Sequence, residues 1–339
     1  MKVVTFGEIM LKFSPMNYQR FLQANAMSVE YAGAEANVAV SLANYGVHSV
    51  FVSKLPNNEF GEAALNSVRH YGVNTDYIVR GGERLGIYFA EKGASQRPSK
   101  VIYDRIGSAI SCASKDDFDW DAIFDGVDWF HWTGITPALS DSLAAICLDA
   151  CMAAKAKGIT ISCDLNYRKK LWSKEKANEV MSGLCKYVDV CIANEEDAAD
   201  VFGIIADKSD VERGSINYES FANVAYQLQD RFGFQKVAIT LRESISASDN
   251  NWSALLVDEE NLYISRKFLI HIVDRIGGGD SFGAGLIYGL NHYESCQQAL
   301  EFAVAASCLK QTIEGDFNMV KVSEVESLMN GNVFGRIKR

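Results

Sequence analysis

Strand-like and helical segments alternate along most of this chain, and this order constrains the fold more than any other feature of the sequence. β-Branched or aromatic runs predict strands at 2–8, 49–53, 76–80, 129–133, 160–164, 189–193 and 236–240. Helical patterns lie between them, ending near 45 in the first case and covering 61–71, 141–157, 174–186, 195–202 and 218–232 later. Because parallel strands need a crossover, usually a helix, this order predicts an α/β fold with a mostly parallel central sheet flanked by helices.

Two segments interrupt this order. Residues 85–91 and 100–105 alternate between apolar and polar side chains, and a turn with Gly, Ser and Pro joins them, which is typical of an antiparallel hairpin with one exposed face. The segments 11–31 and 85–108 together predict a small β-sheet that projects as a lid. We expect a single domain over 1–335, with a solvated surface loop at 206–215.

Composition argues against several classes of partner. The 339 residues carry a formal net charge of −10, which disfavours nucleic-acid or anionic-membrane binding but allows a local arginine cluster to bind an anion. No segment resembles a signal peptide and no apolar run could span a bilayer, so a cytoplasmic protein is expected. The eight cysteines form no CxxC pair, and we expect reduced thiols and no structural zinc site.

The stretch DRIGGGDSFGAG at 274–285 is the strongest candidate for chemistry. Three consecutive glycines leave their backbone N–H groups open to approach, and the residues after them predict a helix over 280–290. A glycine turn at a helix N-terminus is an anion site, because unpaired amides and the helix dipole both favour negative charge. Asp280 could take a hydroxyl proton there during phosphoryl transfer. The plainer alternative is a tight turn with an acidic first-turn residue.

Four features in order resemble the PfkB (ribokinase-like) carbohydrate kinase family. AGAEANVA at 32–39 resembles its G-G-x-x-x-N signature, and the two lid segments accompany it. NEED at 194–197 follows a strand, and DRIGGGD at 274–280 resembles the D-T-x-G-A-G-D signature. The resemblance runs from about residue 3 to about residue 330. It implies a ribokinase-like three-layer α/β/α sandwich with a small β lid.

This resemblance implies roles at the transferring phosphoryl group of ATP. Asp280 would be the catalytic base, and Gly277, Gly278 and Gly279 would form the anion hole. The implied cofactors are ATP and Mg²⁺, and the resemblance also allows a monovalent cation.

Shorter motifs imply which residues lie near Mg²⁺ and the nucleotide. Asn194 and Asp197 resemble an N-x-x-E motif that acts on Mg²⁺ through water, although an acidic helix start would account for Asp197 equally well. Thr240 and Arg242 stand where the family has T-x-G beside the nucleotide phosphates, with Arg242 replacing the glycine. Asn166 would lie toward the nucleotide side.

Two arginines point to an acidic substrate. Arg105 ends the second lid strand and Arg168 follows the strand at 160–164, so both should overlook the carboxyl ends of a parallel sheet. A guanidinium suits a carboxylate, whereas neutral sugars are usually held by Asp and Asn. Lys12 stands where many neutral-sugar kinases of the family carry an Asp. Each arginine alone could also be an ordinary surface charge.

The motifs GEIMLKFSP, Y-x-R at 103–105, D-x-NYRxxLW at 164–172 and GDFN at 315–318 resemble the 2-keto-3-deoxygluconate kinase branch of the family. This implies phosphorylation of that sugar acid at the 6-hydroxyl and a homodimer or higher homo-oligomer formed through the lid. Contacts with the acid are implied for Gly33, Ala34, Asn37, Tyr88, Tyr103, Arg105, Arg168 and Asp316. A fructokinase or other neutral-sugar kinase, and a non-catalytic sugar-acid-binding homologue, stay open as alternatives. A Rossmann-type dehydrogenase is disfavoured, because no G-x-G-x-x-G follows the first strand.

Overall fold

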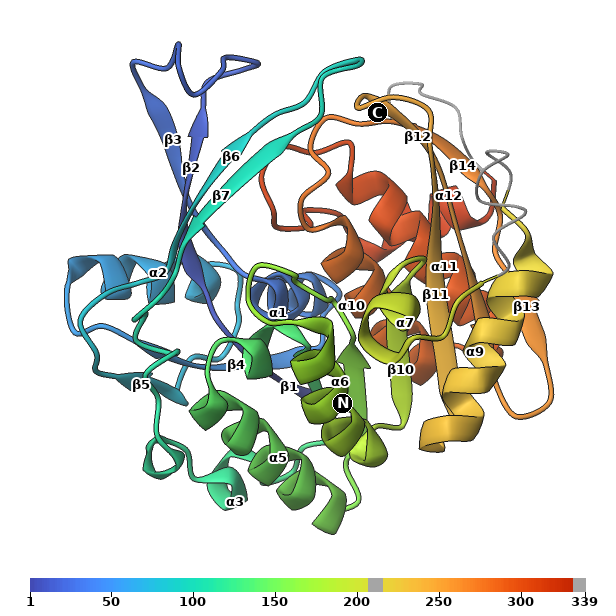
Figure 1. Ribbon diagram of the computed structural model, residues 1–339, viewed down its shortest axis with the longest axis horizontal. Coiled ribbons are helices and arrows are strands. Elements are labelled where there is room, and N and C mark those ends of the chain that lie inside the picture. Colours follow the sequence, from blue (N-terminus) through green and yellow to red (C-terminus); the bar gives the residue numbers. More distant parts are fainter. Residues whose placement is uncertain (207–215, 332–339) are drawn as a thin grey trace.

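A ten-stranded sheet forms the centre of the computed structural model, which describes residues 1–206 and 216–331 (Figure 1). The strand order is β13-β12-β11-β10-β9-β8-β1-β4-β5, and β14 pairs with β12. All pairs from β5 to β11 are parallel, whereas β12 is antiparallel to β11, β13 and β14. The mostly parallel sheet predicted from the sequence is therefore confirmed. Its strands are β1 (Lys2–Phe6), β4 (His48–Leu55), β5 (Ile78–Arg80), β8 (Trp129–Thr133), β9 (Thr160–Asp164), β10 (Val190–Asn194), β11 (Lys236–Ser244), β12 (Asp249–Val257), β13 (Leu262–Ile264) and β14 (Phe268–His271).

Helices cover both faces of this sheet, which gives three layers. Strand residues alternate between two hydrophobic cores: Cys191 and Ala193 of β10 belong to one, and Val190 and Ile192 to the other. The first core is covered by η1 (Lys115–Asp117), α3 (Trp120–Ile123), α4 (Ile135–Ala138), α5 (Asp141–Ala156), α6 (Lys174–Leu184), η2 (Cys185–Tyr187), α7 (Asp197–Phe202) and α9 (Tyr218–Phe232). The other face carries α1 (Ala34–Asn44), α2 (Glu59–Arg69), α10 (Gly278–His292), α11 (Cys296–Lys310) and α12 (Val322–Met329).

A second, four-stranded sheet projects from one side of the molecule (Figure 1). Its order is β3-β2-β6-β7, built from β2 (Met10–Pro15), β3 (Met27–Ala32), β6 (Ile87–Glu91) and β7 (Lys100–Asp104). The β6–β7 hairpin is antiparallel, as its alternating pattern predicted. This sheet is the lid that the two interrupting segments predicted.

The sequence prediction missed several short elements. β2 was not predicted as a strand, because 12–31 mixes polar and aromatic residues without a clear period, and β14 was also missed. The strand at 236–240 continues to Ser244, because β12 pairs with it along its length. Of the loop expected at 206–215, residues 207–215 lie outside the described residues, as do 332–335 of the expected domain.

Two further observations concern the chain as a whole. Across residues 1–206 and 216–331, every helix is too short or too polar to cross a membrane. All eight cysteines are free thiols, as expected from their spacing.

Candidate active site

One cavity of about 490 Å³ lies between the lid and the carboxyl ends of the central strands. Every site residue expected from the sequence lines this cavity, although these residues come from nearly the whole length of the chain. They are Gly33, Ala34, Asn37, Tyr88, Tyr103, Arg105, Asn166, Arg168, Asn194, Asp197, Thr240, Arg242, Gly277, Gly278, Gly279, Asp280 and Asp316.

The glycine turn at the start of α10 has the geometry of an anion site. Gly277 adopts a left-handed conformation (φ +82°), and a Cβ built on it would lie 2.1 Å from the carbonyl oxygen of Asp316, so glycine is required there. Gly278 and Gly279 open the helix: the amide of Gly278 donates to the carbonyl of Arg275 at 3.2 Å, and the amide of Gly279 precedes any intrahelical acceptor. The positive end of the helix dipole therefore faces the cavity.

Asp280 lies in the first turn of the same helix, partly buried at the base of the cavity. The Nδ2 group of Asn37, in the first helix of the chain, donates a hydrogen bond of 2.6 Å to its Oδ2. Burial raises the pKa of Asp280 to about 6, although the bond from Asn37 opposes this shift. A carboxylate with this pKa is a stronger base than an exposed one, yet it is ionised at neutral pH.

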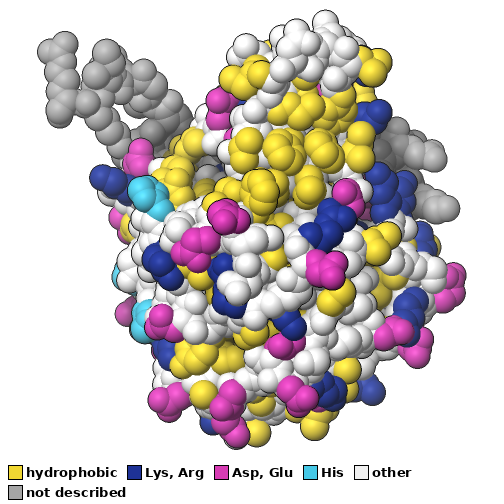
Figure 2. Space-filling model, turned by 90° about the vertical axis from the view of Figure 1, so that its left-hand side faces the viewer, with side chains coloured by type: hydrophobic (Ala, Val, Ile, Leu, Met, Phe, Trp, Pro, Cys, Tyr) yellow, Lys and Arg dark blue, Asp and Glu magenta, His cyan; other side chains and the backbone are white. Residues whose placement is uncertain are grey.

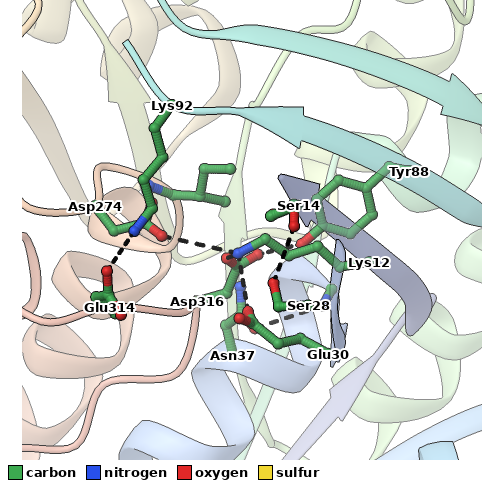
Figure 3. Close-up of polar contacts among 12 residues, drawn as sticks. Lys12, Ser14, Ser28, Glu30, Asn37, Tyr88, Lys92, Asp274, Glu314 and Asp316 are labelled. Atoms are coloured by element: carbon green, nitrogen blue, oxygen red, sulfur yellow. Dashed lines mark hydrogen bonds and ion pairs between the residues drawn. The ribbon is translucent and has the colours of Figure 1, made fainter. Parts of the chain in front are cut away.

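A buried ionic cluster connects the lid to the turn region (Figure 3). The Lys12 ammonium lies 2.6 Å from Oδ1 of Asp316, 2.9 Å from Oε2 of Glu30 and 3.8 Å from Oδ2 of Asp274. The Tyr88 hydroxyl donates to the other oxygen of Asp316. Burial would lower the pKa of Lys12, but the three carboxylates outweigh it and raise this pKa. Lys12 does not line the cavity; it holds Asp316, which does.

Arg105 has a partner that the sequence did not predict. Its Nε and Nη2 groups both donate to Oε2 of Glu8, and both residues are almost fully buried. The guanidinium also lies 5.4 Å from the ring centre of Tyr103, which stacks on Tyr88. Glu8 fixes the position of the guanidinium and offsets part of its charge. Arg105 therefore lines the cavity as a rigid and partly neutralised side chain.

Arg168 is the less constrained of the two arginines. Its Nη1 donates to the carbonyl of Tyr167, and no carboxylate of the described residues forms an ion pair with it. It interacts electrostatically with the carboxylates of Asp164, Asp197 and Asp280. Its charge is therefore available to an anionic ligand at the base of the cavity.

Asp197 joins two loops that line the cavity. Its Oδ1 accepts the backbone N–H of Tyr167 at 3.0 Å, and its Oδ2 accepts that of Asn194 at 3.0 Å. The side chain of Asn194 in turn accepts the amides of Glu196 and Asp197, which starts α7. Among the described residues no group of three or more His, Cys, Asp or Glu side chains has the arrangement of a metal site.

A basic region borders the opposite part of the cavity. Arg242 forms an ion pair with Glu195 at 3.2 Å, and Thr240 is buried beside it with its hydroxyl toward the carbonyl of Ala193. Arg275 donates to the carbonyl of Ala247, and burial, together with the charge of Arg242, lowers its pKa. Two neighbouring guanidiniums beside a glycine turn fit the phosphates of a nucleotide.

Sequence reasoning did not assign a site role to several other residues of the cavity wall, among them the charged residues Glu8, Glu35 and Arg275. Glu35 is fully buried, and its Oε1 accepts bonds from the amide and hydroxyl of Thr133 and from the hydroxyl of Thr136. Burial raises the pKa of Glu35 to about 7. Glu8 lies two residues after the end of β1, and that position was a usable signal. The partners of Glu35 are about 100 positions away, and nothing local indicated them.

Fold and cavity together define a lidded α/β kinase in which a carboxylate and a row of backbone amides meet at a helix N-terminus. A family model described as pfkB family carbohydrate kinase matches residues 1–320. The chain belongs to this family of carbohydrate kinases.

Several relatives share almost the full length of the chain. A solved structure of 2-dehydro-3-deoxygluconokinase from Thermotoga maritima is 53% identical, has a TM-score of 0.94 and covers 98% of this chain and 100% of its own. The 2-dehydro-3-deoxygalactonokinase of Haloferax volcanii is 33% identical over 98% of both chains. The 2-dehydro-3-deoxygluconokinase of Bacillus subtilis is 28% identical over 95% of this chain and 93% of its own.

Proposed function

We propose that this chain transfers the γ-phosphoryl group of ATP to the 6-hydroxyl of 2-dehydro-3-deoxy-D-gluconate (2-keto-3-deoxygluconate). The observation that carries the proposal is the position of Asp280, beside the glycine amides in the cavity that Arg105 and Arg168 also line. A base, an anion site and two guanidiniums in one lidded cavity suit a substrate with a hydroxyl at one end and a carboxylate at the other.

In the proposed reaction, Asp280 accepts the proton of the 6-hydroxyl while that oxygen bonds to the γ-phosphorus and the bond to ADP breaks. The amides of Gly277, Gly278 and Gly279, with the dipole of α10, offset the charge on the transferring group. Bound Mg²⁺ would supply charge neutralisation on the ATP phosphates, with Asn194 and Asp197 held toward it through water. Arg242, Thr240 and Asn166 border the nucleotide end. A closed lid excludes water, which competes with the sugar as acceptor.

The sugar acid would lie under the lid. Its carboxylate end is assigned to Arg105 and Arg168, with Tyr88, Tyr103 and Asp316 beside them. Gly33, Ala34 and Asn37, at the start of α1, border the hydroxyl-bearing middle of the substrate. A Cβ on Gly33 would lie 1.8 Å from the carbonyl of Glu8, so the segment after β1 and the start of α1 can approach this closely only at a glycine.

A coupled assay of ADP release tests this function directly. We expect turnover with 2-dehydro-3-deoxygluconate, and much slower turnover with fructose or ribose. The galactonate-derived acid belongs in the screen, because the H. volcanii relative is named for it. Faster turnover of fructose would favour a neutral-sugar kinase, and ATP and sugar-acid binding without any turnover would favour a non-catalytic homologue.

Replacing Arg168 tests the carboxylate assignment. Arg168→Ala should raise the KM for the sugar acid by about 10-fold or more, since a charge-assisted hydrogen bond is worth roughly 1.5–3 kcal/mol. The KM for a slowly used neutral sugar should change little. The matched control is Lys170→Ala, an exposed cation two positions away that does not line the cavity. Equal losses on both substrates would assign Arg168 to the phosphoryl group instead.

The outer face of the lid supports a homodimer. Lys12 and Tyr88 point into the molecule, and the opposite face of the lid is mostly apolar: Phe13, Val29, Tyr31, Ile87, Phe89 and Ile102. Phe13, Tyr31 and Ile87 pack partly against a hydrophobic core of the chain, whereas Val29 and Ile102 are exposed. The rings of Phe13 and Phe89 stack at 5.6 Å. Figure 2 shows hydrophobic side chains gathered over the lid on this side. A sheet that turns its apolar face outward is typical of an interface, and we propose a second copy of the chain as its partner.

Light scattering after size exclusion tests this association. The wild type should have at least twice the 37.4 kDa mass of one chain. Val29→Lys places a charge on the outer lid face at a half-exposed position, so the variant should fold and be a monomer. Met152→Lys, on an exposed apolar residue of α5, should leave the mass unchanged. A wild type of 37.4 kDa would contradict the dimer.

A cytoplasmic location is part of the proposal. ATP is available there, and eight free thiols suit a reducing compartment.

A further inference from the structure

A fully buried lysine lies behind the glycine turn and has no part in the reaction described so far. Lys310 is the last residue of α11, and its side chain has no solvent exposure. Its Nζ donates a 3.1 Å hydrogen bond to the carbonyl oxygen of Asp274. Within the described residues, no carboxylate oxygen lies within 4.0 Å of this ammonium. A buried ammonium with a single neutral acceptor is costly to maintain, so its presence calls for a physical reason.

The end of α11 holds both sides of the glycine turn. Before the turn, the carbonyl of Gln311 accepts the amides of Val273 and Asp274. After the turn, the hydroxyl of Ser307 donates to the carbonyl of Gly278 at 2.7 Å. Lys310 lies between these attachments in sequence, and its ammonium adds a third one through the carbonyl of Asp274, three residues before Gly277.

Nearby carboxylates partly offset the cost of burying the charge of Lys310. Burial, together with the charge of Lys12, lowers the pKa of its ammonium, and the carboxylates of Asp274, Asp316 and Asp280 oppose this shift only in part. Lys12, the other buried lysine nearby, has direct carboxylate partners at 2.6 and 2.9 Å. Lys12 thus has carboxylate counter-ions in direct contact. Lys310 interacts with the carboxylates of Asp274, Asp316 and Asp280 without such a contact.

We propose that Lys310 is a positioning residue that acts as a built-in monovalent cation: its ammonium holds the Asp274 carbonyl and supports the anion site from behind during phosphoryl transfer. The inference rests on the proposed kinase function. Lys310 does not line the cavity, so it acts through the turn rather than on the substrate. A consequence is that turnover needs no added K⁺ or Na⁺, although the family resemblance allows one.

The alternative is a purely structural lysine that balances the dipole at the end of α11. Lys310→Met separates the two, because it keeps the length of the side chain and removes its charge. We expect kcat to fall by about 10-fold or more, with little change in the KM for ATP and a normal melting curve. Lys155→Met is the matched control: this lysine lies in the last turn of α5, pairs with Asp189 and is half-exposed, and kcat should be unchanged.

Chemical rescue adds a readout that a structural role would not change. Lys310→Ala leaves space beside the Asp274 carbonyl, so 100 mM K⁺ or NH₄⁺ should restore turnover several-fold over choline, with no effect on the wild type. A kcat of Lys310→Met within twofold of the wild type, or no response of Lys310→Ala to either cation, would overturn the inference. If neither variant folds, the wild type decides: stimulation by K⁺ beyond twofold would overturn it, and insensitivity would support it.

The Lys310 variants can also be compared with the wild type in the absence of a sugar. If the wild type phosphorylates none of the acids in the screen, the proposed function fails. Slow ATP hydrolysis in the absence of a sugar would still report on Lys310, because it uses the same anion site.

Discussion

Asp280→Asn lowers turnover of the sugar acid by at least about 10²-fold and leaves the affinity for ATP close to that of the wild type. The asparagine keeps the size of the side chain and can still accept the bond from Asn37, but it cannot take the hydroxyl proton. Steady-state kinetics with 2-dehydro-3-deoxygluconate and calorimetric titration with ADP would measure the two quantities. Near-normal turnover would remove the assignment of Asp280 as the base.

The pKa of Asp280 gives this prediction two internal checks. Burial raises it to about 6, so kcat/KM of the wild type should fall as the pH decreases through about 6, where the base becomes protonated. An unfolded Asp has a pKa of about 3.9, so above that pH the ionised group destabilises the folded state. The asparagine variant should therefore melt no earlier than the wild type at pH 7. Lost turnover combined with a lower melting temperature would indicate misfolding.

Gly279→Ala abolishes most activity without weakening the fold. A Cβ built on Gly279 meets no atom within 4 Å, and the residue lies on the cavity wall in the first turn of α10. The methyl group would occupy the space where the phosphoryl group approaches the amides, and loss of such a donor costs roughly 10²–10³ in kcat. Because alanine costs less conformational entropy than glycine in a helix, stability should rise by about 0.5–1 kcal/mol.

The matched control for this variant is Gly183→Ala. Gly183 lies in α6, and a Cβ there also meets nothing within 4 Å. It should gain the same stability and keep full turnover. Turnover of Gly279→Ala within twofold of the wild type would show that the amide at this position does not face the phosphoryl group.

The alternating order of the sequence predicted most of the fold. For segments with strong periodicity and clear ends, such as Trp129–Thr133 and Tyr218–Phe232, both bounds were predicted to the residue. The lid hairpin was predicted from its two-residue period. β2 was missed because tertiary contacts determine which side chains its two faces carry. Lys12 faces a buried acidic cluster and Phe13 faces outward, so the strand lacks the usual alternation of apolar inward and polar outward residues.

The cavity residues were predictable where a local motif carries the chemistry. The glycine turn and Asp280 are contiguous, and the positions of Arg105 and Arg168 follow from the strand ends that precede them. The partners of these groups were not predictable, because they come from distant parts of the chain. Glu8 lies 97 positions from Arg105, and Asn37 lies 243 positions from Asp280.

The sequence by itself determined the mostly parallel sheet flanked by helices, the lid and the anion-binding turn, because each depends on local periodicity or on consecutive glycines. Only the tertiary structure decided how the charges are matched: Glu8 partly neutralises Arg105, Lys12 holds Asp316, and Lys310 donates to the carbonyl of Asp274. The reason is physical. Backbone conformation is governed by neighbours in sequence, whereas the energy of a buried charge depends on which groups the fold brings within a few ångströms.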